Sequence, residues 1–476
     1  MPSSNKFSSI AVSTLLGVSG CVVGPNFTPP PATKAAAFTN ASMEQLHRAG
    51  TQVDGSQAEP DAWWTLLQSP QLDGAIRQAL KANHSVEAAR ATLAQARALD
   101  VVSDAQRYPS AQFSGSAGRV QYGEAFLGPN LFPPFSFYNI GPSVSYTFDF
   151  AGGIRRTIEE QQAETDYEQH ELDASALAVS GNLALQAVAA AAARAQIDNV
   201  QALLEDDRKD LQLVQSAFDA GSGTRVDVLT AQSQLANDQT LLPPLRRDLS
   251  TATHALALLV GEAPADWSPP EFKLEDFTIP ASLPVSVPSE LAHRRPDILA
   301  AEAQVHAANA AISVATANLY PQLSISANAS LQASKLRDLF ESASSAWGYS
   351  ASLTAPLFNH GSLRAKQRAA LETMHASLAN YQQVLLSSFA QVADALEALD
   401  HDQELIDSEQ GALTVAADSL ELTRESYSAG NSGVLQVLDA QRQNQQARLG
   451  LVRAQSQRLQ DTVQLLMALG GQVPQT

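Results

Sequence analysis

The sequence FDAGSGTRVDVLTAQSQL, residues 218–235, recurs in altered form as YSAGNSGVLQVLDAQRQN, residues 427–444. The two stretches align at an offset of 209 residues, so that the Ala-Gly pair at 220–221 falls on the pair at 429–430. An internal duplication of this kind decides how every other segment is interpreted. The chain therefore contains two copies of one structural unit.

Apolar residues recur at every seventh position before both stretches, a spacing typical of coiled coils. In the first copy no proline interrupts the chain from Gly153 to Phe218. A continuous helix of that length would extend about 100 Å at roughly 1.5 Å per residue, several times the radius of an ordinary domain. The heptad positions are Ile197, Leu204, Leu211 and Phe218 in the first copy, and Ile406, Leu413, Leu420 and Tyr427 in the second.

Each long helix is followed by a glycine, Gly221 or Gly430, where a left-handed helix C-cap is expected. Small and polar residues then start a second helix, so both stretches predict a helical hairpin. Two consecutive prolines, Pro243-Pro244, predict a kink or an interruption in the returning helix of the first copy. The second copy has no proline there, so the two hairpins are not equivalent.

Alternating apolar and small polar residues predict two strands in each copy, with the clearest patterns at 323–331 and 347–355. The first copy has a Ser/Gly-rich strand near 110–122 and a second at 144–150. Such strands occur in membrane β-barrels, and also in soluble sheets with one wet face. Four strands cannot close a barrel, and lipid does not tolerate an open edge, so other chains would complete it. Two chains with eight strands or three with twelve both satisfy this argument.

Composition excludes several classes of protein. The 476 residues include 30 Lys+Arg and 49 Asp+Glu, a net charge of −19, which argues against binding to nucleic acid or an anionic lipid surface. A single cysteine excludes an internal disulfide, a cysteine-based zinc site and an iron–sulfur cluster within one chain.

The sequence contains no phosphate-binding loop, no GxSxG motif and no HExxH motif. His293 and His306 are expected on the surface or in packing rather than at a metal. The acidic pairs Glu159-Glu160 and Asp206-Asp207 are expected on solvated or lumen-facing sides of long helices. We therefore predict no enzymatic activity, no cofactor and no metal site.

The N-terminus has the layout of a signal peptide. Lys6 precedes the apolar residues 10–17, and Val18-Ser19-Gly20 leads directly to Cys21. A lone cysteine in that position resembles a lipoprotein signal, in which the thiol is acylated. The alternative is an ordinary secretory signal with an incidental cysteine. Val22, where an Asp would resemble an inner-membrane retention signal, favours the outer membrane.

The order of these parts resembles the TolC-like outer-membrane efflux factors, specifically the lipoprotein branch similar to OprM and NodT. The resemblance covers essentially the whole chain after Cys21. The motifs that carry it are CVVGPNFTPP from Cys21, AWWTLLQSPQLDGAIRQALKANHSVEAARATLAQAR from Ala62, LPPLRRDLSTATHALALLVGEAP from Leu242, HRRPDILAAEAQVHAANAAISVATANLYPQLS from His293 and YSAGNSGVLQVLDAQ from Tyr427.

The resemblance implies an α-helical protein with a membrane β-barrel, in which a trimer completes a twelve-stranded barrel and an α-helical tunnel. It implies passive export of small molecules such as drugs or metal ions, with a periplasmic adaptor protein and an inner-membrane transporter of the RND type as partners. By resemblance, Leu435, Asp439 and Arg442 match the positions of a periplasmic gate. The hairpin tips that would dock the adaptor contain Gly221, Gly223, Gly430 and Gly433.

The expected organisation has six parts. They are a signal peptide (1–20), an extended equatorial segment (21–61), the first repeat (62–261), an equatorial linker (262–288), the second repeat (289–470) and a tail (471–476). Two other functions remain open at this point: type I protein secretion through the same architecture, and a trimeric structural or adhesive coiled coil.

Overall fold

A computed structural model describes residues 22–31, 37–38, 52–53, 62–123, 133–280, 282–283 and 288–474. The predicted signal peptide and Cys21 lie outside these residues. The chain divides into two compact units. We call them the sheet unit (residues up to Pro30, Ala94–Tyr167 and Ala301–Tyr381) and the hairpin unit (Pro31–Leu93, Glu168–Ala300 and Gln382–Thr476).

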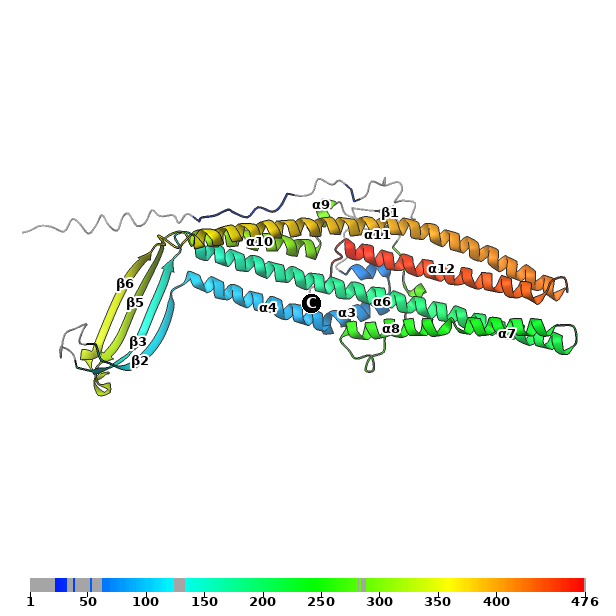
Figure 1. The fold of residues 1–476 in the computed structure, drawn as a ribbon, viewed down its shortest axis with the longest axis horizontal. Helices are drawn as coiled ribbons and strands as arrows, with labels where there is room; N and C mark the ends of the chain where they lie inside the picture. The colour runs from blue at the N-terminus through cyan, green and yellow to red at the C-terminus, as the bar shows by residue number, and fades with distance from the viewer. Residues whose placement is uncertain are drawn as a thin grey trace, which may run out of the picture. The chain divides into compact units, whose positions relative to one another are not determined.

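The sheet unit contains one four-stranded antiparallel sheet of order β2-β3-β5-β6 (Figure 1). The four strands confirm the four that alternation predicts, but β3 begins well before residue 144. Gly141 lies within this unpredicted part, where an added Cβ would be 2.1 Å from the Ala329 carbonyl oxygen of β5. The bounds are β2 Ser110–Val120, β3 Phe135–Phe148, β5 Gln322–Ala333 and β6 Ser345–Thr354.

Four helices contribute residues to both units. The helices α6 and α11 each have 67 residues, as the uninterrupted first-copy sequence predicts for α6. The bounds are α4 His84–Asp104, α6 Gly153–Asp219, α10 Pro296–Ala317 and α11 Ser362–Ser428.

The hairpin unit contains the two predicted helical hairpins (Figure 1). The first hairpin consists of the end of α6, the turn at 220–224 and α7. The second consists of the end of α11, the turn at 429–433 and α12. As predicted, the returning helix of the first copy is interrupted, because α7 ends before Pro243-Pro244, whereas α12 is continuous. The bounds are α3 Pro70–Ala82, α7 Arg225–Gln239, α8 Leu242–Val260, α9 Pro288–Leu291 and α12 Val434–Ala468, with β1 Gln52–Val53 parallel to β4 Ser282–Leu283.

The main core of the hairpin unit forms around Trp63 and Trp64, which are 1% exposed. Their indole nitrogens donate to Ser180 Oγ at 3.1 Å and to Asp73 Oδ1 at 2.9 Å, respectively. Ala187 and Ala191 of α6 are buried in the same cluster, so the alanine-rich stretch allows helices to approach closely.

Helix α6 is also the one described helix whose length and composition would suit a membrane span, with a window of mean hydropathy 1.5. That window is 61% buried inside the chain. Because the apolar side chains already pack against protein, we interpret this window as helix packing and not as a span.

Candidate functional site

The sheet separates apolar from polar side chains across all four strands. Residues opposite one another in an antiparallel register point to the same face, so the pairing assigns each side chain to a face. One face carries Phe113 on β2, Ile140, Val144, Tyr146 and Phe148 on β3, Leu323, Ile325 and Leu331 on β5, and Trp347, Tyr349 and Leu353 on β6.

The opposite face is composed mainly of small polar residues. It carries Ser110, Gln112, Ser114 and Ser116 on β2, Asn139, Ser143, Ser145 and Thr147 on β3, Ser324, Ser326 and Asn328 on β5, and Ser350 and Ser352 on β6. Phe135 and Phe137 are exceptions at the beginning of β3. Lipid on one face and water on the other is the arrangement of a membrane β-barrel wall.

The apolar face is exposed in the single chain. Trp347 and Tyr349 stack with their ring centroids 6.3 Å apart and are 76% and 80% exposed. The described strands also leave two sheet edges, β2 and β6, without a partner strand. Unpaired backbone groups are costly in lipid, so a sheet of this kind needs further strands to close it.

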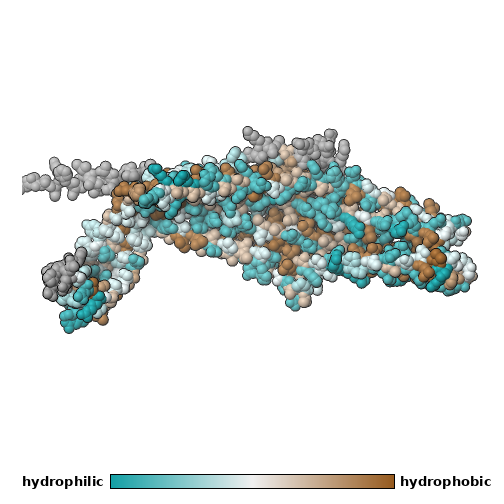
Figure 2. Space-filling view, viewed as in Figure 1, coloured by the Kyte–Doolittle hydropathy of each residue, from teal (hydrophilic) through white to brown (hydrophobic). Residues whose placement is uncertain are grey.

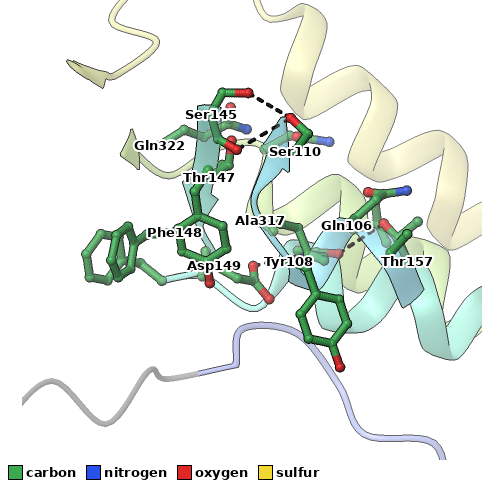
Figure 3. Close-up of a pocket in the computed structure, with 18 of the residues that line it drawn as sticks. Gln106, Tyr108, Ser110, Ser145, Thr147, Phe148, Asp149, Thr157, Ala317 and Gln322 are labelled. Carbon is green, nitrogen blue, oxygen red and sulfur yellow. Dashed lines mark hydrogen bonds between the residues drawn. The ribbon is translucent and has the colours of Figure 1, made fainter. Parts of the chain in front are cut away.

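A cavity of about 560 Å³ lies where β2 and β3 meet the first turns of α6, within the sheet unit (Figure 3). Asp149 occupies this junction and accepts hydrogen bonds from the amides of Ile154 and Arg155, both at 3.0 Å. This carboxylate satisfies free amides at the start of α6. Nearby, Ser110 and Ser145 join the two strands through their hydroxyls at 2.8 Å. The junction thus fixes the direction in which the strand leads into the helix.

Glycine is required at both hairpin tips. Gly221 and Gly430 have φ of 76° and 77°, the left-handed conformation that the sequence predicts. In each turn an amide reaches back to the preceding helix, from Ser222 to the Ala217 carbonyl and from Asn431 to the Ser426 carbonyl, both at 2.9 Å. These contacts form the C-caps that end the two long helices.

The returning helices begin with different caps. Thr224 and Asp227 form a reciprocal capping box, in which the Thr224 amide donates to Asp227 Oδ2 at 2.9 Å. The Thr224 donors hold the pKa of Asp227 below its usual range. In the second hairpin the Gly433 amide donates to Gln436 Oε1 at 3.1 Å, and the cap residue offers no side chain in return.

The three proposed gate residues are on the exposed side of α12. Leu435 is 53% exposed, whereas its neighbours Val434 and Leu438 pack in the core between the hairpins. Asp439 is paired with Arg442, and it also accepts from Gln443 Nε2 at 2.9 Å. Leu435 is therefore available to a pore or to another chain and is not a core leucine of its own hairpin.

Apolar side chains reach the surface near the ends of both hairpins (Figure 2). Val226, the counterpart of Leu435 in the first copy, is 68% exposed. Phe218 and Leu229 are 36% and 51% exposed. Exposed apolar groups concentrated at one end of a helical hairpin favour a protein contact there.

The prediction that Asp206-Asp207 lie on a solvated face is wrong for Asp207, which is 3% exposed. Burial, and then the neighbouring Asp238 carboxyl, raise the pKa of Asp207 to about 7. A second buried carboxyl, Asp402, faces Asp461, and burial followed by that contact raises its pKa to about 7. The sequence contains no local signal for these pairs, because their members are on different helices.

The other predicted polar residues take part in packing. His306 stacks on Phe27 with ring centroids 4.2 Å apart, and its Nε2 lies 3.1 Å from Glu159 Oε1. Glu159 also binds Arg156, so this acid is partly buried in a network and does not simply face solvent. Glu160 is half-buried, and burial raises its pKa. Among the described residues, no group of three or more His, Cys, Asp or Glu side chains could hold a metal ion.

The model of the outer membrane efflux protein family matches residues 75–262 and 287–471. The chain belongs to this family. The family resemblance predicted from the sequence is confirmed. The members of the family are outer-membrane channel proteins rather than enzymes.

The relatives agree with this assignment. The chain is 30% identical over 482 residues to the pyoverdine export outer membrane protein OpmQ of Pseudomonas aeruginosa, covering 98% of this chain and 97% of the relative. It is 27% identical to the probable outer membrane lipoprotein SilC of Salmonella typhimurium, covering 98% and 99%. The solved structure of the outer-membrane channel OprN superimposes with a TM-score of 0.85 at 28% identity, covering 95% and 99%.

The chain is therefore an outer-membrane efflux channel protein that extends into the periplasm. The predictions of fold class, export function and location are confirmed at this level. The two-faced sheet has the surface chemistry expected of a membrane wall.

Proposed function

We propose that three copies of the chain assemble into one exit duct, with a twelve-stranded barrel in the outer membrane and an α-helical tunnel in the periplasm. The observation that carries this proposal is the sheet with one apolar face, one polar face and two open edges. Edge β2 of one copy would pair with edge β6 of the next, and repetition closes the barrel. The polar faces then line a water-filled pore.

The duct would receive small molecules such as drugs or metal ions from an inner-membrane pump of the RND type through a periplasmic adaptor. Support comes from the efflux systems to which its relatives belong and from the exposed apolar residues at the hairpin tips. The adaptor would dock at the turns containing Gly221, Gly223, Gly430 and Gly433. Leu435, Asp439 and Arg442 would form the periplasmic gate, since they are exposed on one helix near that end.

Acylation of Cys21 would add a lipid anchor to the barrel. The signal-like residues before Cys21 support it, as does the lipoprotein name of the relative SilC. Replacing Cys21 with Ser should abolish incorporation of labelled fatty acid, while the barrel still inserts in the membrane. Label retained by the variant would refute acylation at this residue.

The assembly is tested by mass and conductance of the full-length protein. Detergent-solubilised protein should have a mass of about 145–150 kDa, three times a mature chain slightly smaller than 50.5 kDa. It should also form discrete single channels in planar bilayers. A monodisperse monomer with native strand content, or a trimer that conducts no ions under any voltage or salt, would refute the duct.

A further inference from the structure

Two carboxyl groups connect the helices of the first hairpin. Asp207 of α6 is 3% exposed, and the carboxyl of Asp238 on α7 lies within hydrogen-bonding reach of it. Asp207 Oδ2 is buried and accepts no hydrogen bond from the donors of the described residues. Two carboxylates in contact, one of them buried, repel each other strongly, whereas one proton between them converts the repulsion into a hydrogen bond.

The groups around Asp207 do not compensate for its negative charge. On α6, the charged groups acting on it are the acids Asp206 and Asp210. On α12, it is faced by the neutral amide of Gln441, whose Nε2 donates to Asp207 Oδ1 at 3.3 Å. On α7, the facing charge is Asp238, which accepts from Gln234 Nε2 at 2.7 Å.

Two nearby cations, Lys209 and Arg424, are bonded to a different acid. Lys209 Nζ lies 3.2 Å from Asp206 Oδ1, and Arg424 of α11 lies 3.3 Å from Asp206 Oδ2. Asp206 is therefore a partly exposed, ion-paired carboxylate, while the adjacent Asp207 is buried among acids. The contrast between the two consecutive aspartates identifies Asp207 as the residue whose charge the fold disfavours.

We propose that Asp207 and Asp238 share one proton, and that this proton holds α6 and α7 together in the first hairpin. Loss of the proton leaves two carboxylates in contact and loosens the hairpin at this level. The pair would make the first hairpin respond to the pH of the periplasm.

The direction of the effect follows from proton binding. The ordinary pKa of an aspartate is 3.8, and burial together with Asp238 raises the pKa of Asp207 to about 7. The closed hairpin therefore binds more protons than the open one between these two values. The stability that the shared proton contributes is fully present below pH 3.8 and is lost as the pH rises through about 7.

Hydrogen exchange on the full-length protein in detergent tests the proposal. The equilibrium constant for local opening at the amides around residues 207 and 238 is obtained by correcting for intrinsic exchange rates. It should increase about tenfold or more between pH 5 and pH 8. Asp207→Asn keeps the size of the side chain and removes its charge, so this increase should largely disappear. Because Asp238 is only half-buried, Asp238→Asn should disturb packing less than Asp207→Asn, and it serves as a second variant. It should also largely abolish the increase in opening between pH 5 and pH 8.

The matched control is Asp206→Asn, the same substitution one residue away at a partly exposed position. It should retain most of the wild-type pH dependence, because Asp206 acts on Asp207 only through a weaker charge repulsion and takes no part in the shared proton. An unchanged pH dependence in both Asp207→Asn and Asp238→Asn would overturn the proposal, as would its equal loss in Asp206→Asn. Since the measurement requires no transport, its failure is distinguishable from failure of the proposed duct.

Discussion

The two hairpins have the same turn geometry but different surface chemistry. Both turns use a left-handed glycine, with φ of 76° and 77°, and both pack in one apolar cluster that contains Val228 and Leu438. The first hairpin has a capping box and an interrupted returning helix, whereas the second has a continuous helix with Asp439 and Arg442 on its surface. The duplication has therefore preserved what the backbone requires and allowed the exposed side chains to diverge.

The two hairpins also differ in their buried acids. Each hairpin contains one carboxyl pair between its two helices, Asp207–Asp238 in the first and Asp402–Asp461 in the second. The pairs do not correspond at the offset of 209 residues, so the duplication does not explain them. They also have different neighbours, because Arg458 acts on Asp402 whereas the charged groups acting on Asp207 are acids.

The largest difference between the hairpins is expected at the proposed gate. Asp439→Ala should raise single-channel conductance severalfold and weaken cation selectivity, because it removes a ring of carboxylates from the aperture. The equivalent first-copy residue is Thr230, and Thr230→Ala should leave both quantities unchanged. Conductance and reversal potential in planar bilayers measure the two effects. If Asp439→Ala behaves like Thr230→Ala, the constriction is not at this position.

A smaller difference is expected at the second carboxyl pair. Asp402→Asn should increase the free energy of local opening of α11 and α12 at pH 8 by about 2 kcal/mol, and much less at pH 4. Burial and then Asp461 raise the pKa of Asp402 to about 7, so the wild-type pair loses stability as the pH rises through that value. Hydrogen exchange near residues 402 and 461 measures this free energy of opening at both pH values. An equal effect at both pH values would show that Arg458 already neutralises the pair.

Most of the fold can be predicted from the sequence because its signals are local and periodic. Heptads predict the long helices, glycine predicts the turns and Pro243-Pro244 predicts the break between α7 and α8. The beginning of β3 cannot be predicted from the sequence, because Phe137 and Tyr138 are consecutive apolar residues and Pro142 lies within the strand. A regular alternation is therefore absent over its first half.

The carboxyl pairs could not be predicted, for a different reason. Asp207 is adjacent to Asp206 in sequence, and nothing local separates a buried acid from an exposed one on a helix rich in charged residues. Only the packing of α7 and α12 against α6 distinguishes them. The gate residues follow from the family resemblance alone, and the exposure of Leu435 is compatible with a position on a pore but does not define its role.

The two hairpin tips should lose the same amount of stability when their left-handed glycine is replaced by alanine. Gly221→Ala and Gly430→Ala should each destabilise their hairpin by about 1 kcal/mol, because an alanine Cβ is unfavourable in the left-handed conformation. An added Cβ would meet no atom within 4 Å at either glycine, so backbone strain is the only expected cost. Local opening measured by hydrogen exchange at the two turns provides the comparison. A cost at one tip alone would mean that the two turns differ in the assembled protein.

The smallest effect is expected at the caps of the returning helices, where the hairpins should again differ. Thr224→Ala should destabilise the start of α7 by about 0.5–1 kcal/mol, because the Thr224 side chain accepts from the Asp227 amide at 3.2 Å. The corresponding Gly433→Ala should cost less, since the cap there is made by the Gln436 side chain and the Gly433 amide, which alanine retains. Exchange of the first-turn amides of α7 and α12 measures both changes in the same sample conditions. If Gly433→Ala costs as much as Thr224→Ala, the capping box does not account for the difference between the two helix starts.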